Sequence, residues 1–442
     1  MNYSKINWVI VAFVFCFAAA GGNSQSTTAQ TGEATSPLKI QLPLAPRPFP
    51  EPLAAGRQPG FKFRGTKGWD WTPEQYLQEI PWLVKFKMNF LMNCYLSLFT
   101  SNHPRINEWW KPLPENTKRA FAGVIRSCQT NGIVFCFCMN PQLAAERPLN
   151  PTNTGDLDQL TRHYLWAQSL GVKWFSICVD DVKWTQTPAV AAGQDGYMVN
   201  TVLARLRMQD PDAQMVFCPG PYYGDGTRPD DHLYLQTLAR SLDPNVYVFW
   251  TGDGDSSIAP KITVAAASSY KAAVNHRLFL WDNYPVNDEH QTLNLGPLTG
   301  RESGLCDVID GYMSNPMATQ NQINRIPLAT AADYACNPWK YDPSRSIAQA
   351  ICLLENTRAR QEVLRDLVEA YPGFLAAGGG PGANPVRREF HELKEETDPL
   401  PAREFLDQMD TLSHQLKYEF PGEFDAAKKT VNADVAWMRA QP

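Results

Sequence analysis

The chain has 442 residues, of which 44% are apolar and 19% are charged, so it can bury a sizeable core in one large domain or in two to three smaller ones. Its net charge is −5 at pH 7, and acidic and basic residues are interspersed along it. This distribution argues against a nucleic-acid-binding protein, which would carry a basic patch.

The N-terminus has the pattern of a secretory signal peptide. A lysine in MNYSK precedes the apolar run INWVIVAFVFCFAAA, and small residues follow it. The run is shorter than the roughly twenty residues that a membrane-spanning helix needs. We expect a signal peptide over residues 1–22 and a disordered leader over residues 23–57. This predicts a secreted or periplasmic protein with no stable membrane insertion after cleavage; an uncleaved anchor is the alternative.

From residue 58 onward, short apolar runs alternate with helical patterns. The predicted strands span residues 60–65, 88–95, 133–140, 172–181, 214–220, 246–252, 277–283 and 307–315. The predicted helices between them span residues 72–86, 115–132, 156–171, 198–209, 232–243 and 260–274. Eight buried strands separated by helices predict an α/β fold, a parallel (β/α)₈ TIM barrel over residues 58–335. A doubly wound sheet is the competing architecture, but it normally has fewer strands.

Beyond residue 320 the pattern becomes wholly helical. The predicted helices there span residues 321–335, 344–371, 404–420 and 424–438, with a glycine-rich break at residues 376–385. We therefore expect a C-terminal helical bundle over residues 336–442, attached to the barrel.

Ten cysteines are present, and nine remain if the signal peptide, which contains Cys16, is removed. Several of them fall inside predicted strands, and an odd count argues against a disulfide framework. We expect them to be buried thiols.

In a barrel of this kind, the functional site forms at the carboxyl ends of the strands. The predicted strand ends are rich in polar and aromatic residues: Arg64, Gly65, Tyr95, Met139, Asn140, Asp180, Asp181, Tyr222, Tyr223, Trp250, Thr251, Trp281, Asp282, Asn283, Asp288 and Asn315. Aromatic walls with directional hydrogen-bonding groups are typical of a sugar-binding pocket.

The predicted fourth strand, in FSICVDDV, runs directly into Asp180 and Asp181. A single aspartate at a strand end is more often a helix cap or a turn former than a catalyst. Two adjacent carboxylates repel each other and lose hydration when they are buried. We therefore interpret this pair as functional.

Other chemistries fit less well. The seven histidines contain no His-x-His pair, and none lies at a predicted strand end, which argues against a zinc hydrolase. A magnesium site built from Asp180, Asp181 and Asp288 would lack a glycine-rich phosphate-binding motif. No serine or cysteine nucleophile elbow is present. We predict no metal and no cofactor.

Several motifs together resemble the family 84 glycoside hydrolases, the β-N-acetylglucosaminidases that include O-GlcNAcases. The motifs are VDDV, CPGPYYG, FWTGDG, LWDNYPVND and DGYMSNPMA, followed by DYACNPWKYDPSRSIAQAI in the segment after the barrel. The resemblance covers roughly residues 58–360, and the combination is specific although no single motif is.

The resemblance implies a retaining mechanism in which the substrate's own 2-acetamido oxygen attacks the anomeric carbon and forms an oxazoline. It implies that Asp180 holds the acetamido N–H and that Asp181 is the general acid and then the general base. Repulsion within the pair is expected to raise the pKa of Asp181. The implied sugar-binding residues are Gly65 (through its carbonyl), Tyr222, Trp281, Asn283, Asp288 and Asn315.

Two stretches depart from the family pattern. TKGWDW follows Gly65 in place of a Val-Glu-Gly-Phe-Tyr-Gly variant, and YLSLFTS lacks the family's lysine after the second strand. Lys67 and Asp70 are the candidates to replace that lysine.

The sequence thus predicts an exported retaining β-N-acetylglucosaminidase that acts on terminal N-acetylhexosamine of N-acetylglucosamine-containing glycans or glycoconjugates. The alternatives are a catalytically silent sugar-binding protein on the same barrel and a related hexosaminidase with a shifted sugar preference.

Overall fold

Eight parallel strands close into a barrel in which each strand pairs with its neighbours along the chain and β1 pairs with β8. The structure is a computed structural model that describes residues 38–45, 47–99, 107–288 and 290–442. The strands are β1 (Phe63–Thr66), β2 (Phe90–Met92), β3 (Val134–Met139), β4 (Trp174–Cys178), β5 (Gln214–Cys218), β6 (Tyr247–Trp250), β7 (Arg277–Pro285) and β8 (Gly311–Asn315). The predicted TIM barrel is confirmed, and the doubly wound sheet is excluded.

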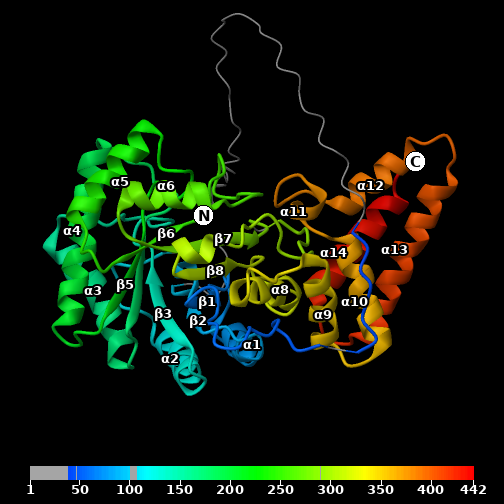
Figure 1. The fold of residues 1–442 in the computed structure, drawn as a ribbon, viewed down its shortest axis with the longest axis horizontal. Helices are drawn as coiled ribbons and strands as arrows, with labels where there is room; N and C mark the ends of the chain where they lie inside the picture. Colours follow the sequence, from blue (N-terminus) through cyan, green and yellow to red (C-terminus); the bar gives the residue numbers. More distant parts are fainter. Residues whose placement is uncertain (1–37, 46, 100–106, 289) are drawn as a thin grey trace, which may run out of the picture. The chain divides into compact units, whose positions relative to one another are not determined.

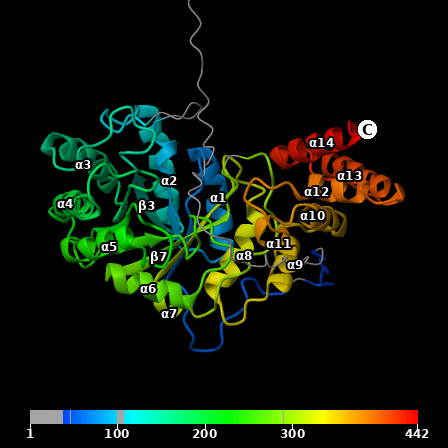
Figure 2. The same cartoon turned by 90° about the horizontal axis from the view of Figure 1, so that it is seen from above.

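Helices connect the strands and lie on the outside of the barrel (Figures 1 and 2). They are α1 (Pro73–Lys85), α2 (Glu115–Thr130), α3 (Thr154–Ser169), α4 (Pro188–Arg207), α5 (Pro229–Ser241), α6 (Val264–Val274), α7 (Leu305–Val308) and α8 (Arg325–Cys336), with a 3₁₀ turn, η1, over Tyr95–Ser97. The six predicted connecting helices are present, although α4 begins at Pro188 rather than at residue 198. The start of the predicted eighth strand is instead the single turn α7, and β8 begins only at Gly311.

Local sequence explains where these helices begin. Thr72 and Gln75 form a reciprocal capping box at the start of α1, and Pro73 occupies its first turn. The side chain of Asn153 accepts from the backbone N–H of Asp156 at the start of α3. Each cap satisfies backbone donors that would otherwise lack partners.

Two layers of apolar side chains stabilise the barrel. One fills the space between strands and outer helices, and the other fills the barrel interior. The interior layer is aromatic and thiol-rich: Phe63, Phe90, Phe279 and Tyr247 with Cys94, Cys136, Cys138, Cys178 and Cys218. The cysteines of the described residues are all free thiols. The sequence predicted that all of them are buried, and this is confirmed for each except the partly exposed Cys306.

The C-terminal helices pack around a third apolar cluster. They are α9 (Pro343–Leu354), α10 (Arg358–Ala370), α11 (Phe374–Ala377), α12 (Pro385–Lys394), α13 (Leu400–Glu419) and α14 (Asp425–Arg439). The predicted helix over residues 344–371 is two helices, because Glu355 is extended and Thr357 caps α10. Helix α12 was not predicted; its buried face consists of only Pro385, Val386 and Phe390.

The chain before β1 crosses these C-terminal elements. The backbone N–H groups of Ile40, Arg47 and Glu51 donate to the side chains of Glu369, Gln349 and Asp333, respectively. The described residues 38–45 and 47–57 therefore make specific contacts, unlike the predicted disordered leader, although none of them lies in a helix or strand. The predicted signal peptide, residues 1–22, lies outside the described residues, as do residues 23–37.

Helix α8 contacts β1 and β8, whereas α9 and α10 contribute to the C-terminal cluster. We therefore propose that the barrel domain ends near residue 336, close to the boundary expected from the sequence. No helix among the described residues has both the length and the apolar character needed to cross a bilayer.

Candidate active site

A cavity of about 70 Å³ opens at the carboxyl ends of the strands. Seven of the eight predicted site residues line it, and every strand except β3 contributes to its wall. The lining residues are Lys67, Trp69, Tyr95, Asp180, Asp181, Cys218, Tyr222, Thr251, Ser257, Trp281, Asn283, Asp288 and Asn315. Larger grooves of about 510 and 590 Å³ lie on the C-terminal helices and near the amino ends of β1 and β2, but neither has two adjacent carboxylates in its lining.

Gly65 is the predicted site residue that does not line the cavity. It lies in β1 opposite Phe90 of β2, and a Cβ atom at this position would lie 1.8 Å from the Phe90 carbonyl oxygen. Close packing of the two strands therefore requires glycine here. The wall of the cavity at β1 is formed by Lys67 and Trp69 instead.

The backbone explains how two consecutive aspartates reach one cavity. Side chains alternate between the faces of a strand, so Ser176, Cys178 and Asp180 share the inward face of β4. The strand ends at Cys178, and Asp181 adopts a φ of 61°. This left-handed conformation is uncommon for a residue with a side chain and breaks the alternation. Both carboxylates therefore line the same cavity.

Asp180 is buried and held by two donors. The Tyr95 hydroxyl donates to Oδ2 at 2.7 Å, and Nδ2 of Asn140 donates to Oδ1 at 3.1 Å. Burial, followed by the neighbouring Cys178 and Asp181, raises the pKa of Asp180 to about 8. The positive charge of Lys67 and the Tyr95 hydrogen bond act in the opposite direction. The sequence could not show that Asp180 is the carboxyl that loses its hydration.

Asp181 is exposed and has one tyrosine partner. The Tyr222 hydroxyl donates to Oδ1 of Asp181 at 2.7 Å. Burial, followed by the negative charge of Asp181, raises the pKa of Tyr222, so its hydroxyl stays protonated and remains a donor. The two carboxylates thus differ: one is fixed below the surface, and the other faces solvent.

Lys67 is enclosed by aromatic rings. Its side chain is almost fully buried, and Nζ lies 3.8 Å from the ring centroid of Trp281, 4.1 Å from that of Trp69 and 5.1 Å from that of Tyr95. Cation–π attraction offsets part of the cost of burying the ammonium group. This places a positive charge beside Asp180 from the first strand, where the family pattern has none.

Amide side chains from β7 and β8 form the neighbouring part of the wall. Nδ2 of Asn315 donates to Oδ1 of Asn283 at 2.8 Å, and Nδ2 of Asn283 donates to the Ser257 carbonyl at 2.8 Å. The β7–β8 pairing shifts register between Asp282 and Pro285, which turns this part of β7 toward the cavity mouth. Oδ1 of Asn315 and Nε1 of Trp281 are buried and have no hydrogen-bond partner among the described residues, so they are available to a polar ligand.

A buried ion pair supports this wall. Arg301 donates to both oxygens of Asp282, at 2.6 and 2.9 Å, and the Tyr312 hydroxyl donates to Oδ2 of the same carboxylate at 2.9 Å. Both charged side chains are at most 2% exposed. The pair fixes β7 directly before Asn283.

The match to known proteins is specific. Residues 65–369 match the sequence model of a family described as beta-N-acetylglucosaminidase. The chain belongs to this family. It is therefore a glycoside hydrolase.

Solved structures share the fold of this chain. A mutant of the O-GlcNAc hydrolase of Thermobaculum terrenum superposes with a TM-score of 0.71 at 21% identity, covering 86% of this chain and 83% of the other. A protein named CpGH84B gives a TM-score of 0.69 at 21% identity, covering 86% of this chain and 67% of the other.

Sequence reasoning missed four residues of the β-N-acetylglucosaminidase cavity as site candidates. Lys67 was named only as a candidate to replace the family's lysine, and Trp69 only within the stretch TKGWDW. Cys218 was treated as a core thiol, and Ser257 lies in a loop seven residues beyond β6. Lys67 and Trp69 could have been found from their position just after the first predicted strand. Nothing in the sequence distinguished Ser257 from other loop serines.

Potential metal ligands near this cavity are thiols rather than histidines. Cys178, Asp180 and Cys218 place their ligand atoms within 4.8 Å of one another. None of the described histidines lines the cavity.

Proposed function

We propose that the chain is a retaining β-N-acetylglucosaminidase that hydrolyses terminal N-acetylhexosamine by substrate-assisted catalysis. The observation that carries the proposal is the unequal environment of two adjacent carboxylates in one cavity: Asp180 is buried between two donors, and Asp181 is exposed beside Tyr222. The proposed substrates are glycans or glycoconjugates that end in N-acetylglucosamine.

In the first step, Asp180 accepts a hydrogen bond from the acetamido N–H and increases the nucleophilicity of the acetamido oxygen. Its carboxylate can do this because Tyr95 and Asn140 fix its orientation, and each oxygen keeps a further lone pair. The acetamido oxygen attacks the anomeric carbon while Asp181 donates a proton to the departing glycosidic oxygen. The products of this step are the free aglycone and a bound oxazoline.

In the second step, Asp181 takes a proton from water, and the water oxygen attacks the anomeric carbon of the oxazoline. The acetamido group is restored, and two successive inversions give retention of configuration. The exposure of Asp181 fits this role, because the residue must meet first the aglycone and then water. Tyr222 holds its carboxylate throughout.

Together, the carboxyl groups of Asp180 and Asp181 must carry one proton before the first step. With a pKa of about 8, the Asp180 carboxyl is mostly protonated at neutral pH before substrate binds. An acetamido N–H that approaches Asp180 favours its ionised form. Substrate binding would therefore favour the ionised Asp180 that the first step requires.

A thiazoline mimic of the oxazoline tests the mechanism. We expect competitive inhibition of aryl β-N-acetylglucosaminide hydrolysis with an inhibition constant at least about 100-fold below the KM, because the mimic resembles the intermediate. Hydrolysis that the thiazoline does not inhibit would reject substrate assistance.

The silent sugar-binding protein remains the second candidate because the cavity wall at β1 departs from the family pattern. N-acetylglucosamine binding without turnover of any aryl β-N-acetylhexosaminide would favour it. Faster turnover of galacto- than of gluco-configured substrates would favour the shifted sugar preference.

Export is also a proposal, supported by the sequence of residues 1–22. Mass spectrometry of the protein recovered from the periplasm or the medium should show a chain that begins near residue 23. Recovery of the full-length chain with the membrane fraction would support the uncleaved anchor instead.

A further inference from the structure

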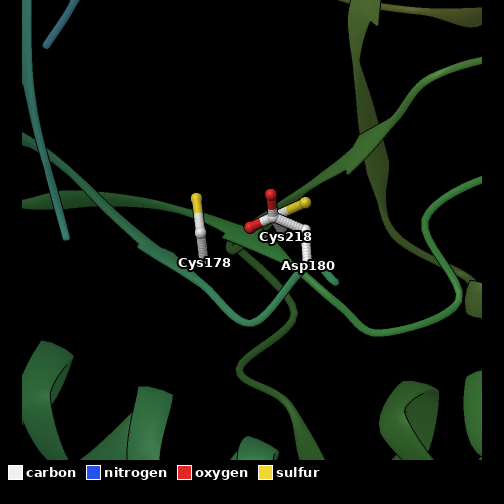
Figure 3. Close-up of side chains that lie close together, drawn as sticks. All are labelled: Cys178, Asp180 and Cys218. Carbon is white, nitrogen blue, oxygen red and sulfur yellow. The ribbon is translucent and has the colours of Figure 1, made fainter. Parts of the chain in front are cut away.

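Three thiols and a carboxylate converge at the floor of the cavity. Cys178 and Cys218 are paired residues on the neighbouring parallel strands β4 and β5, so both side chains point into the barrel interior side by side. Asp180 lies two residues after Cys178 on the same face. Figure 3 shows its carboxylate close to both sulfur atoms, and the ligand atoms of the three residues all lie within 4.8 Å of one another.

Cys138 extends the cluster on the other side of Cys178. The two Sγ atoms are 3.4 Å apart, close to the spacing of sulfur ligands around one tetrahedral ion with metal–sulfur bonds of roughly 2.3 Å. Within the described ranges, the group around Cys178 is the one set of three such side chains whose ligand atoms lie this close together. Isolated buried cysteines are ordinary packing residues. Several thiols that converge beside a carboxylate are not explained by packing alone.

The cluster is reachable from solvent. Cys218 and Asp180 both line the sugar cavity, whereas Cys178 lies behind them. A small ion can therefore enter through the cavity mouth. Its remaining coordination position would face the space that the sugar occupies.

The surroundings of Asp180 also suit a metal ligand. Carboxylates that bind metals are usually fixed by hydrogen bonds from outer groups, and Tyr95 and Asn140 supply these here. Thiolate sulfur selects soft or borderline ions over magnesium or calcium.

We propose that Cys178, Cys218 and Asp180 form a binding site for a soft divalent metal ion, with the Cys138 thiol packed beside it, and that the bound ion blocks the sugar cavity. Each coordinating thiol releases one proton when the metal–sulfur bond forms, so the dipositive charge is balanced by two thiolates. The ion occupies the Asp180 oxygen that would otherwise accept from the acetamido group. Soft metal ions are thus inhibitors that compete with the sugar.

A Cd²⁺ titration tests the site without relying on activity. The protein is kept reduced with a phosphine and titrated with Cd²⁺, while the ultraviolet charge-transfer absorption from thiolate to Cd²⁺ is recorded. We expect a band that saturates at one equivalent. Cys178→Ser and Cys218→Ala should each lose most of it. Cys306→Ser is the matched control, because that thiol lies outside the cavity on α7, and it should keep the band.

Circular dichroism shows whether each variant is folded, and a crystal soaked in Cd²⁺ supplies a second measurement. An anomalous peak between Cys178 and Cys218 would support the site even if one variant does not fold. No band in the native protein, a band that survives both cavity variants, or an anomalous peak only elsewhere would overturn the proposal.

Inhibition is measured separately. Zn²⁺ should lower the hydrolysis of an aryl β-N-acetylglucosaminide at least about tenfold at saturation, with recovery on chelation, and the Cys306→Ser variant should respond in the same way. If Cd²⁺ binds at the cluster but Zn²⁺ leaves hydrolysis unchanged, the blocking role is rejected. If the protein hydrolyses no such substrate, the absorption titration still decides the metal site, so this proposal and the proposed function fail independently.

Discussion

Tyr95, in the turn after β2, donates a hydrogen bond of 2.7 Å to Oδ2 of Asp180 at the end of β4. The bond favours the ionised carboxylate, as does the positive charge of Lys67, whereas burial favours the protonated form more strongly and raises the pKa of Asp180 to about 8. The balance of these effects determines the pH at which the carboxylate pair loses its last proton.

We therefore predict a bell-shaped dependence of kcat/KM on pH, with an alkaline limb near pH 8 where the pair loses that proton. Lys67→Met removes a cation that favours ionisation, so the pKa of Asp180 rises and the alkaline limb moves to higher pH, by at least about 0.5 unit. The profile is measured on an aryl β-N-acetylglucosaminide.

Tyr95→Phe should move the same limb in the same direction, because it removes a donor to the carboxylate. Lys62→Met is a matched control, since Lys62 does not line the cavity. A limb that stays in place in both cavity variants, or that moves to lower pH, would show that Asp180 does not govern it.

Asp181→Asn removes the proposed general acid. Activity on substrates with poor leaving groups should fall by about 100-fold or more, because these need a proton on the departing oxygen. Aryl substrates with acidic leaving groups should lose much less in the first step. Steady-state kinetics across a series of phenol leaving groups measures this difference, and an equal loss across the series would contradict the assignment.

Asp180→Asn should stabilise the protein against heat at alkaline pH. The Asp180 carboxyl holds its proton more tightly in the folded protein, where its pKa is about 8, than in the unfolded chain, where it is about 3.9. Raising the pH between these values removes this proton from the unfolded chain first, so the native protein loses stability over that range. The Asp180→Asn variant has no carboxyl at this position, so it does not lose stability in this way.

The Tm of Asp180→Asn should therefore exceed that of the native protein at pH 8, and the difference should shrink toward pH 5. Asp255→Asn is the matched control, because the Asp255 side chain is fully exposed. The same Tm difference at both pH values would indicate that desolvation of Asp180 is not its cause.

The buried pair Arg301–Asp282 should be far more sensitive than a surface pair of equal length. Arg301→Met leaves an uncompensated buried carboxylate and should cost about 3–5 kcal/mol in the free energy of unfolding. Arg277→Met breaks the partly exposed contact with Asp310, also 2.6 Å long, and should cost less than about 1 kcal/mol. Urea unfolding measures the loss of unfolding free energy in each variant. Equal losses would contradict the conclusion that the buried pair stabilises the cavity wall.

The barrel could be predicted from the sequence because its strands and helices have recognisable local patterns. The strand around Phe175 and Ile177 is a buried β-branched and aromatic run, and helices such as α1 begin at a readable capping box. Helix α12 escaped detection because its apolar face is short. The split between α9 and α10 depends on the extended conformations of Glu355 and Thr357.

The cavity was predictable in its strand-end residues and not in its electrostatics. Asp180, Asp181 and Asn315 follow from strand position. The aromatic cage around Lys67 includes Trp281, which lies more than 200 residues later in the chain. No local sequence pattern predicts this contact. Likewise, which of the two aspartates is buried depends on the left-handed turn at Asp181, which the residue types do not specify.

The contact between Ile40 and Glu369 joins positions 329 residues apart, and β1 can pair with β8 only after residue 311 has been made. During synthesis, the first described residues therefore find their partners only after α8, α9 and α10 have been made. A nascent chain that ends before β8 has an unpaired edge at β1, and such edges promote association with other chains. We expect this protein to depend on chaperones late in translation, when the barrel is almost complete but still open.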